Sequence, residues 1–214
     1  MHLIAGARHL ASVITWKPLA ATAVATTVWI ALAVRPSGLL LSIAAAAVAG
    51  TVSYVLDDPA AATLQSSPAT LLRRRAHRVA LALPPLGVWW ALATAIVSRS
   101  AEHLPLAAPT LQYAALVSIG LAGSCIAWRI SGDRARGGTT GALAVIICFG
   151  TGFMPARSLQ LVPVDPAAPG AARQLTVLLV FAVALQLGSS IDPARRPRLG
   201  HRLRPVRDPS CDNH

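Results

Sequence analysis

Histidine, cysteine and serine are the residues of this sequence that could serve as bases, nucleophiles or metal ligands. The three cysteines, Cys125, Cys148 and Cys211, are scattered, with no CxxC pair and no histidine at zinc-ligand spacing. All six histidines fall outside the long apolar segments, so Ser124 in "GLAGSC" lacks a base that could activate it at membrane depth. We therefore predict no enzyme activity, no metal site and no cofactor.

Two short segments are similar to parts of known motifs but are incomplete. The segment "SGDRARGG", residues 131–138, resembles the opening of lipid phosphotransferase motifs, yet the downstream pair of aspartates that would hold a metal is missing. The segment "CFGTGFMP", residues 148–155, contains two glycines at which a helix could break, as in a re-entrant segment. We interpret the first as a short positive turn and the second as a weak candidate for a selectivity filter.

The elements that surround these residues follow from an unusually apolar composition. The 214 residues are 54% hydrophobic and 13% charged, whereas soluble domains average about 45–50% apolar and 25% charged residues. A helix needs roughly 17 to 25 apolar residues to cross a bilayer, and six apolar runs of that kind are present. They are residues 18–34, 38–56, 79–97, 110–130, 139–155 and 174–191. We predict an all-α integral membrane protein with a six-helix transmembrane domain in residues 18–191.

The positions of the cations predict the orientation of these spans, because Lys and Arg in short loops resist translocation. Fifteen of the 19 cations lie on one side, in the N-terminal segment, the loop 57–78, the fourth-to-fifth connection and the tail. The other side has Arg35, Arg99, Arg157 and Arg173. Both termini should therefore be cytoplasmic in a plasma-membrane protein. The net charge of +11 then reflects topology, and no nucleic-acid partner is expected. The strong preference for arginine over lysine is typical of a high-GC bacterial genome.

The two ends of the chain are predicted to lie at the cytoplasmic face. Residues 1–17 place most of their apolar side chains on one side of a helix, which favours an amphipathic interfacial helix over a short disordered lead. Residues 192–214 hold six arginines and four prolines, which predicts a basic disordered tail held near anionic lipid. The triplet at residues 31–33 leaves open a cleaved signal peptide, after which the other five spans would keep their orientation.

Few side chains inside the predicted spans could carry an ion or a proton. Arg129 is the one ionisable candidate, at the cytoplasmic end of the fourth span, and Gln186 is the one strongly polar side chain well inside a span. We assign Gln186 to an interhelical hydrogen bond, and the small residues repeated every four positions in the second and fourth spans to close helix packing. Pro84 and Pro85 predict a kink in the third span. The chain is thus expected to lack its own means of using an ion gradient.

The segment "DDPAAATLQSSPATLLRRRAHR", residues 57–78, contains more signals than orientation requires. An aspartate before proline at 58–59 and a serine before proline at 67–68 are signatures of a helix start. They predict two short cytoplasmic helices, the second of which leads into the third span. Because an orientation signal needs only the arginines, Asp57, Asp58 and the first helix are left without a role.

The order of these elements is similar to that of a transporter family. An interfacial helix, two spans, a structured cytoplasmic loop, four more spans and a long extracellular connection, "ARSLQLVPVDPAAPGAAR", resemble the export-type permease of ABC transporters. The chain is shorter than typical members, and its last connection is richer in proline. The resemblance implies that residues 57–72 form a coupling element that docks on a separate ATP-binding subunit. Its polar contacts would be Asp57 and Asp58, and its apolar contacts Leu64, Leu71 and Leu72.

We therefore predict the transmembrane subunit of an ABC-type exporter, assembled with a second copy or a second permease chain. In the expected mechanism, ATP-driven closure of the partner pushes on residues 57–72 and rocks the second and third spans about a hinge at Pro84 and Pro85. The alternative is a non-transporting accessory, immunity or assembly protein whose arginine-rich segments recruit partners or anionic lipid. A membrane enzyme ranks third.

Overall fold

A computed structural model describes residues 16–33, 37–56, 71–99, 106–131, 137–154, 160–166 and 168–189. This part of the chain contains six α-helices and no β-strand, which confirms the predicted all-α fold. Each helix overlaps one of the six predicted spans. The helices are α2 (Trp16–Leu32), α3 (Gly38–Val52), α4 (Leu71–Ser98), α5 (Ala107–Ser131), α6 (Gly137–Gly150) and α7 (Ala171–Ser189). The 3-10 turns η1 (Ser53–Leu56) and η3 (Thr151–Phe153) extend α3 and α6.

The predicted terminal elements fall largely outside these residues. Of the expected interfacial helix, only Trp16 and Lys17 are described, and they are the first residues of α2. The expected tail, residues 192–214, lies outside the described part of the chain.

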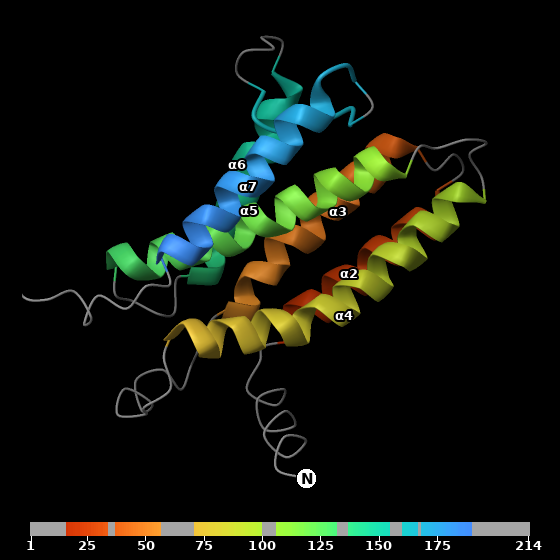
Figure 1. Cartoon of the computed structure of the whole chain (residues 1–214). Helices are drawn as coiled ribbons and strands as arrows, with labels where there is room; N and C mark the ends of the chain where they lie inside the picture. Colours follow the sequence, from red (N-terminus) through yellow and green to blue (C-terminus); the bar gives the residue numbers. More distant parts are fainter. Residues whose placement is uncertain are drawn as a thin grey trace, which may run out of the picture.

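α4 joins the second predicted cytoplasmic helix to the third span. That helix was expected to lead through residues 71–78 into a span starting at residue 79, and one continuous helix starts at Leu71 and includes Pro84 and Pro85 in its interior. Its 28 residues give a length of about 42 Å at 1.5 Å per residue, which exceeds the roughly 30 Å of bilayer hydrocarbon. Each proline removes one backbone donor from the helix. Figure 1 shows that the axis of α4 changes direction between its yellow start and its yellow-green end.

α5 lies at the centre of the bundle. It packs against α3, α6 and α7, and α3 also contacts α6. On the other flank α2 and α4 lie side by side, and α3 contacts both of them. Successive helices run in opposite directions (Figure 1), so the connections between them alternate between the two ends of the bundle.

The outward faces of the helices are apolar. More than half of the side-chain surface is exposed at several large residues of α7, α6 and α4, namely Val177, Val180, Phe181, Leu187, Leu143, Ile146, Ile147, Leu83 and Val88. Soluble monomers rarely expose apolar surface on this scale. Lipid is the medium that such a surface fits.

Helix length and composition agree with this interpretation. Four segments are long and apolar enough to cross a membrane: Gly38–Leu56, Arg75–Ser98, Ala107–Ala127 and Ala171–Ser189. The segment Gly137–Phe153 is apolar but shorter, and α2 has 17 residues. These features indicate a membrane protein, in which the first and fifth predicted spans are the shortest once η1 and η3 are counted with α3 and α6.

Candidate functional site

The predicted partner contacts are placed only in part. Asp57, Asp58 and Leu64 lie outside the described residues. Leu71 and Leu72 are the first two residues of α4, but their side chains are also outside the described part. The structure therefore connects the end of the predicted coupling element directly to a helix of the bundle.

The predicted hinge residues, Pro84 and Pro85, are exposed on α4. The opposite face of α4 packs against the bundle. Its buried positions recur every three or four residues, namely Arg78, Ala82, Leu86, Trp89, Trp90, Ala93 and Val97. A bend at the prolines therefore changes how this packed face meets its neighbours.

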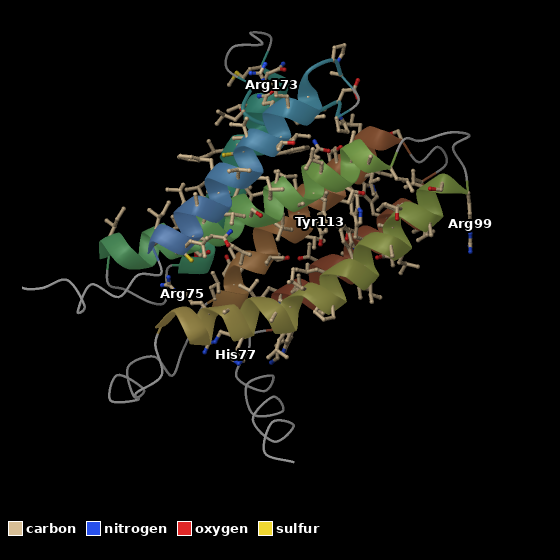
Figure 2. All side chains as sticks on the ribbon, in the orientation of Figure 1. Arg75, His77, Arg99, Tyr113 and Arg173 are labelled. Carbon is tan, nitrogen blue, oxygen red and sulfur yellow. The ribbon has the colours of Figure 1, made fainter. Side chains whose placement is uncertain are left out.

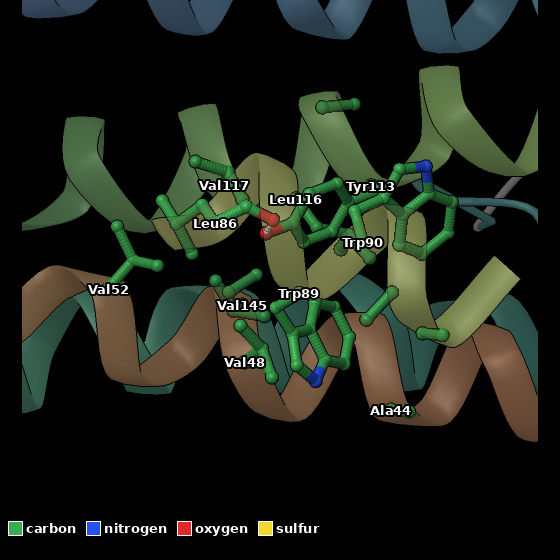
Figure 3. Close-up of a cluster of buried hydrophobic side chains, with 14 of the residues drawn as sticks. Ala44, Val48, Val52, Leu86, Trp89, Trp90, Tyr113, Leu116, Val117 and Val145 are labelled. Atoms are coloured by element: carbon green, nitrogen blue, oxygen red, sulfur yellow. Dashed lines mark hydrogen bonds between the residues drawn. The ribbon is translucent and has the colours of Figure 1, made fainter. Parts of the chain in front are cut away.

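Three aromatic rings fill the space between α4 and α5 (Figure 3). Trp90 of α4 stacks on Tyr113 of α5, with ring centroids 4.5 Å apart and planes inclined by 7°. Trp89 is tilted against both rings, with centroid distances of 6.1 Å to Trp90 and 5.6 Å to Tyr113. The indole N–H of Trp89 donates to the carbonyl of Ala23 on α2 (3.2 Å), and that of Trp90 to the hydroxyl of Thr110 on α5 (3.1 Å). This aromatic cluster, Trp89, Trp90 and Tyr113, joins α4 to both neighbours.

Gln112 of α5 is a polar side chain that the sequence analysis missed, because it is only the third residue of its predicted run. It is 1% exposed. The hydroxyl of Ser42 on α3 donates to its Oε1 (2.7 Å), and its Nε2 donates to the carbonyl of Pro163 (2.7 Å). Gln186, the glutamine that was singled out, donates from Nε2 to the carbonyl of Ser118 (2.8 Å), which confirms the expected interhelical bond.

The segment 160–166, which we call the cap segment, folds onto the end of the bundle where α7 begins. Val162 is fully buried, and a Cβ at Gly152 of η3 would collide with the carbonyl oxygen of Val162. The backbone N–H of Leu161 donates to the hydroxyl of Thr151 (3.0 Å), and Nε2 of Gln174 on α7 donates to the carbonyl of Leu161 (2.9 Å). The cap segment is rich in proline and contains no helix, and it packs over this end of the bundle.

Glycine and serine allow α3, α5 and α6 to approach closely at the opposite end. A Cβ at Gly141 of α6 would lie 2.5 Å from the Cβ of Ser53 and nearer still to Oγ of Ser124 and the carbonyl oxygen of Gly120. The hydroxyl of Ser53 donates to the carbonyl of Gly138 (2.8 Å), and that of Ser124 to the carbonyl of Gly120 (3.1 Å). This confirms the packing role predicted for small residues, and it gives Ser124 a structural partner.

The described charged side chains gather at the two ends of the bundle (Figure 2). The end where α2 and α4 begin, which we call the Arg75 end, carries Arg75 and His77 (Figure 2). Lys17 and Arg78 lie at the same end, within the first two or three turns of α2 and α4. The other, the Arg99 end, carries Arg99, Asp165 and Arg173. Tyr113 lies between them (Figure 2). This distribution is the one expected of helices that cross a bilayer.

Hydrogen bonds connect the helices of the described part of the chain. The described residues include no group of three or more His, Cys, Asp or Glu side chains that could hold a metal ion. Serine and glutamine side chains inside the bundle donate to backbone carbonyls of neighbouring elements. Such bonds hold helices in register and can transmit a movement from one helix to the next.

No protein-family model, curated protein or solved structure matches this chain. The function must therefore be argued from the residues and the geometry of the chain itself.

Proposed function

We propose that the chain is the transmembrane subunit of an ABC-type exporter, with six spans and both termini on the cytoplasmic side of the plasma membrane. The topology is supported by the cations of the Arg75 end, which lie on the side that the charge count assigns to the cytoplasm. α2, with 17 residues, is about 26 Å long. A helix of this length crosses a membrane after slight local thinning, at a cost of a fraction of a kcal/mol per Å.

Labelling of single cysteines tests this topology. In a chain without its native cysteines, His77→Cys and Arg99→Cys place a thiol at exposed positions of opposite ends. In intact cells, a membrane-impermeant maleimide is expected to label the variant at 99 at once and the variant at 77 only after permeabilisation. Labelling in the reverse order would exclude cytoplasmic termini.

The observation that carries the exporter proposal is the continuity of α4. This helix begins at Leu71, within the predicted coupling element, and extends without a break to Ser98. Its packed face contacts α5 through the aromatic cluster and α2 through the Trp89 bond. A force applied to residues 57–72 therefore has a continuous helical path into the bundle.

The mechanism follows from this path. ATP binding closes the partner ATPase, which displaces residues 57–72 and with them the start of α4. The bend at Pro84 and Pro85 converts the displacement into a change of angle between the two halves of α4. Because Trp90 stacks on Tyr113, the change reaches α5, the central helix. Alternation between two such arrangements, in a dimer or with a second permease chain, would open the pathway to either side in turn.

Association with the ATPase is tested by a charge reversal. Asp57→Arg/Asp58→Arg should abolish copurification with an ATP-binding subunit and the stimulation of its ATP turnover. The matched control, Glu102→Arg/Asp165→Arg, makes the same charge change on the predicted extracellular side and should leave both unchanged. If both variants associated equally with the ATPase, the proposal that residues 57–72 form the coupling element would be contradicted.

A second candidate, a non-transporting accessory or assembly protein, is favoured by the tight packing at Gly141 and by the internal bonding of Gln112. Close packing of this kind and a buried glutamine bonded within the protein suit a scaffold that does not move. Replacement of residues 57–64 by a flexible linker of equal length distinguishes the two: a scaffold keeps its function, whereas a coupled permease loses transport and ATPase stimulation.

A further inference from the structure

Two arginines of α4 lie on its packed face. Arg78 is 5% exposed and Arg75 is half-buried, whereas His77 between them is exposed. Residues three apart on a helix share a face, and this face continues through Ala82 and Leu86 toward the aromatic cluster. An arginine that only orients a span needs no particular face. The position of this pair therefore requires another explanation.

Arg75 lies close to the ends of two further helices. Its guanidinium lies near Cys125 of α5, and the thiol of Cys125 makes a hydrogen bond with the side chain of Ser189, the last residue of α7. Figure 2 shows Arg75 between the start of α4 and these helix ends. Arg75 thus lies near the ends of α5 and α7, and Arg78 lies one turn further along the same face of α4.

The depth of the pair in the membrane follows from the spacing of charges along α4. The stretch between Arg78 and Arg99, residues 79–98, contains no charged residue. Its length is about 30 Å at 1.5 Å per residue, which equals the thickness of the hydrocarbon core. Arg78 is therefore at the boundary of the hydrocarbon, and Arg75, about one turn further out, is at the depth of the lipid phosphates.

The described charged groups around Arg75 would attract an anion. The basic side chains described at the Arg75 end are Lys17, Arg75, His77 and Arg78, and the one carboxylate of the described residues, Asp165, is at the Arg99 end. A guanidinium binds phosphate through two parallel hydrogen bonds. Each arginine has five N–H donors, so a contact within the protein leaves donors for a phosphate.

We propose that Arg75, with Arg78 behind it on the same face of α4, binds the phosphate headgroup of an anionic lipid of the cytoplasmic leaflet, beside the ends of α5 and α7. The inference depends on the membrane placement proposed above and not on transport. A lipid held there would join α4 to α5 and α7 at the end opposite the cap segment.

The test is a competition for the purified full chain in detergent, without any ATPase. Equal amounts of phosphatidylglycerol and phosphatidylcholine are added, and native mass spectrometry gives the ratio of the two bound lipids. We expect roughly tenfold preference for phosphatidylglycerol, since cations near a membrane surface attract anionic headgroups. Arg75→Gln/Arg78→Gln should bring the ratio close to one. Arg99→Gln/Arg173→Gln removes the same charge at the other end and should keep the preference.

Three results would overturn the proposal. An equal loss in both variants would mean that net charge attracts the lipid. An unchanged preference in the Arg75 and Arg78 variant would place the lipid elsewhere. Loss of the preference in excess inorganic phosphate would identify a site for a free anion. If the double variant does not fold, Arg75→Gln is compared with Arg173→Gln, with about threefold loss expected for the first and none for the second.

Discussion

Substitution of Gly141 by alanine tests the close approach of α6 to its neighbours. An ideal Cβ there would lie 2.5 Å from the Cβ of Ser53, and closer to Oγ of Ser124 and the carbonyl oxygen of Gly120. Ordinary contacts of a Cβ are 3.4–4 Å, so α6 must move outward by about 1 Å. The carbonyl of Gly120 belongs to the backbone of α5 and cannot rotate away. The shift also strains the 2.8 Å bond from Ser53 to Gly138.

The expected loss of stability in Gly141→Ala can be worked out from these effects. Overpacking of a dense core costs about 1–3 kcal/mol, a strained hydrogen bond about 1 kcal/mol, and alanine recovers up to about 1 kcal/mol of helix propensity. We expect Gly141→Ala to lower the free energy of unfolding by about 2 kcal/mol. For a chain of this size the midpoint of thermal unfolding should fall by about 4 to 8 °C.

Gly87→Ala provides the matched control for this experiment. Gly87 also lies inside a helix, but nothing is within 4 Å of its ideal Cβ. Its replacement should therefore leave stability unchanged or raise it by up to about 1 kcal/mol. Both variants are compared with wild type by thermal unfolding in detergent, with tryptophan fluorescence as the recorded signal. Equal midpoints for the two variants would show that the helices are not as close as the Gly141 contacts require.

Five further substitutions test other features of the structure by the same thermal assay. Gln112→Leu leaves two buried partners unbonded and should lower the free energy of unfolding by about 1–3 kcal/mol, with faster proteolysis of the cap segment. The control Gln186→Leu should lower it by about 0.6 kcal/mol. Equal losses would contradict the role of the bond between Gln112 and the cap segment. Trp90→Leu should cost about 2–4 kcal/mol, and Trp29→Leu, at a position that is 47% exposed, less than about 0.5 kcal/mol. Gly170→Ala should lower the free energy of unfolding by about 1 kcal/mol, because φ is +84° there. An unchanged midpoint would contradict this backbone conformation.

Local properties of the sequence were sufficient to predict the helices. A run of apolar residues long enough to cross the hydrocarbon is visible without any knowledge of its neighbours, and all six runs became helices. The helical conformation of residues 71–78 was also expected, because the second predicted cytoplasmic helix leads through them into the third span. The predicted contacts Asp57, Asp58 and Leu64 lie outside the described residues and stay predictions.

Tertiary structure decided which of many similar residues matter. Gln112 and Gln186 are both polar residues in apolar runs, but Gln112 joins three elements because Ser42, 70 residues away in sequence, and Pro163 meet it in space. Likewise Gly141 and Gly87 are both helical glycines, and only Gly141 is crowded. Composition and length act along the chain, so one sequence shows them. Crowding and pairing depend on the atoms that a different helix brings into contact, and these are known only once the helices are packed.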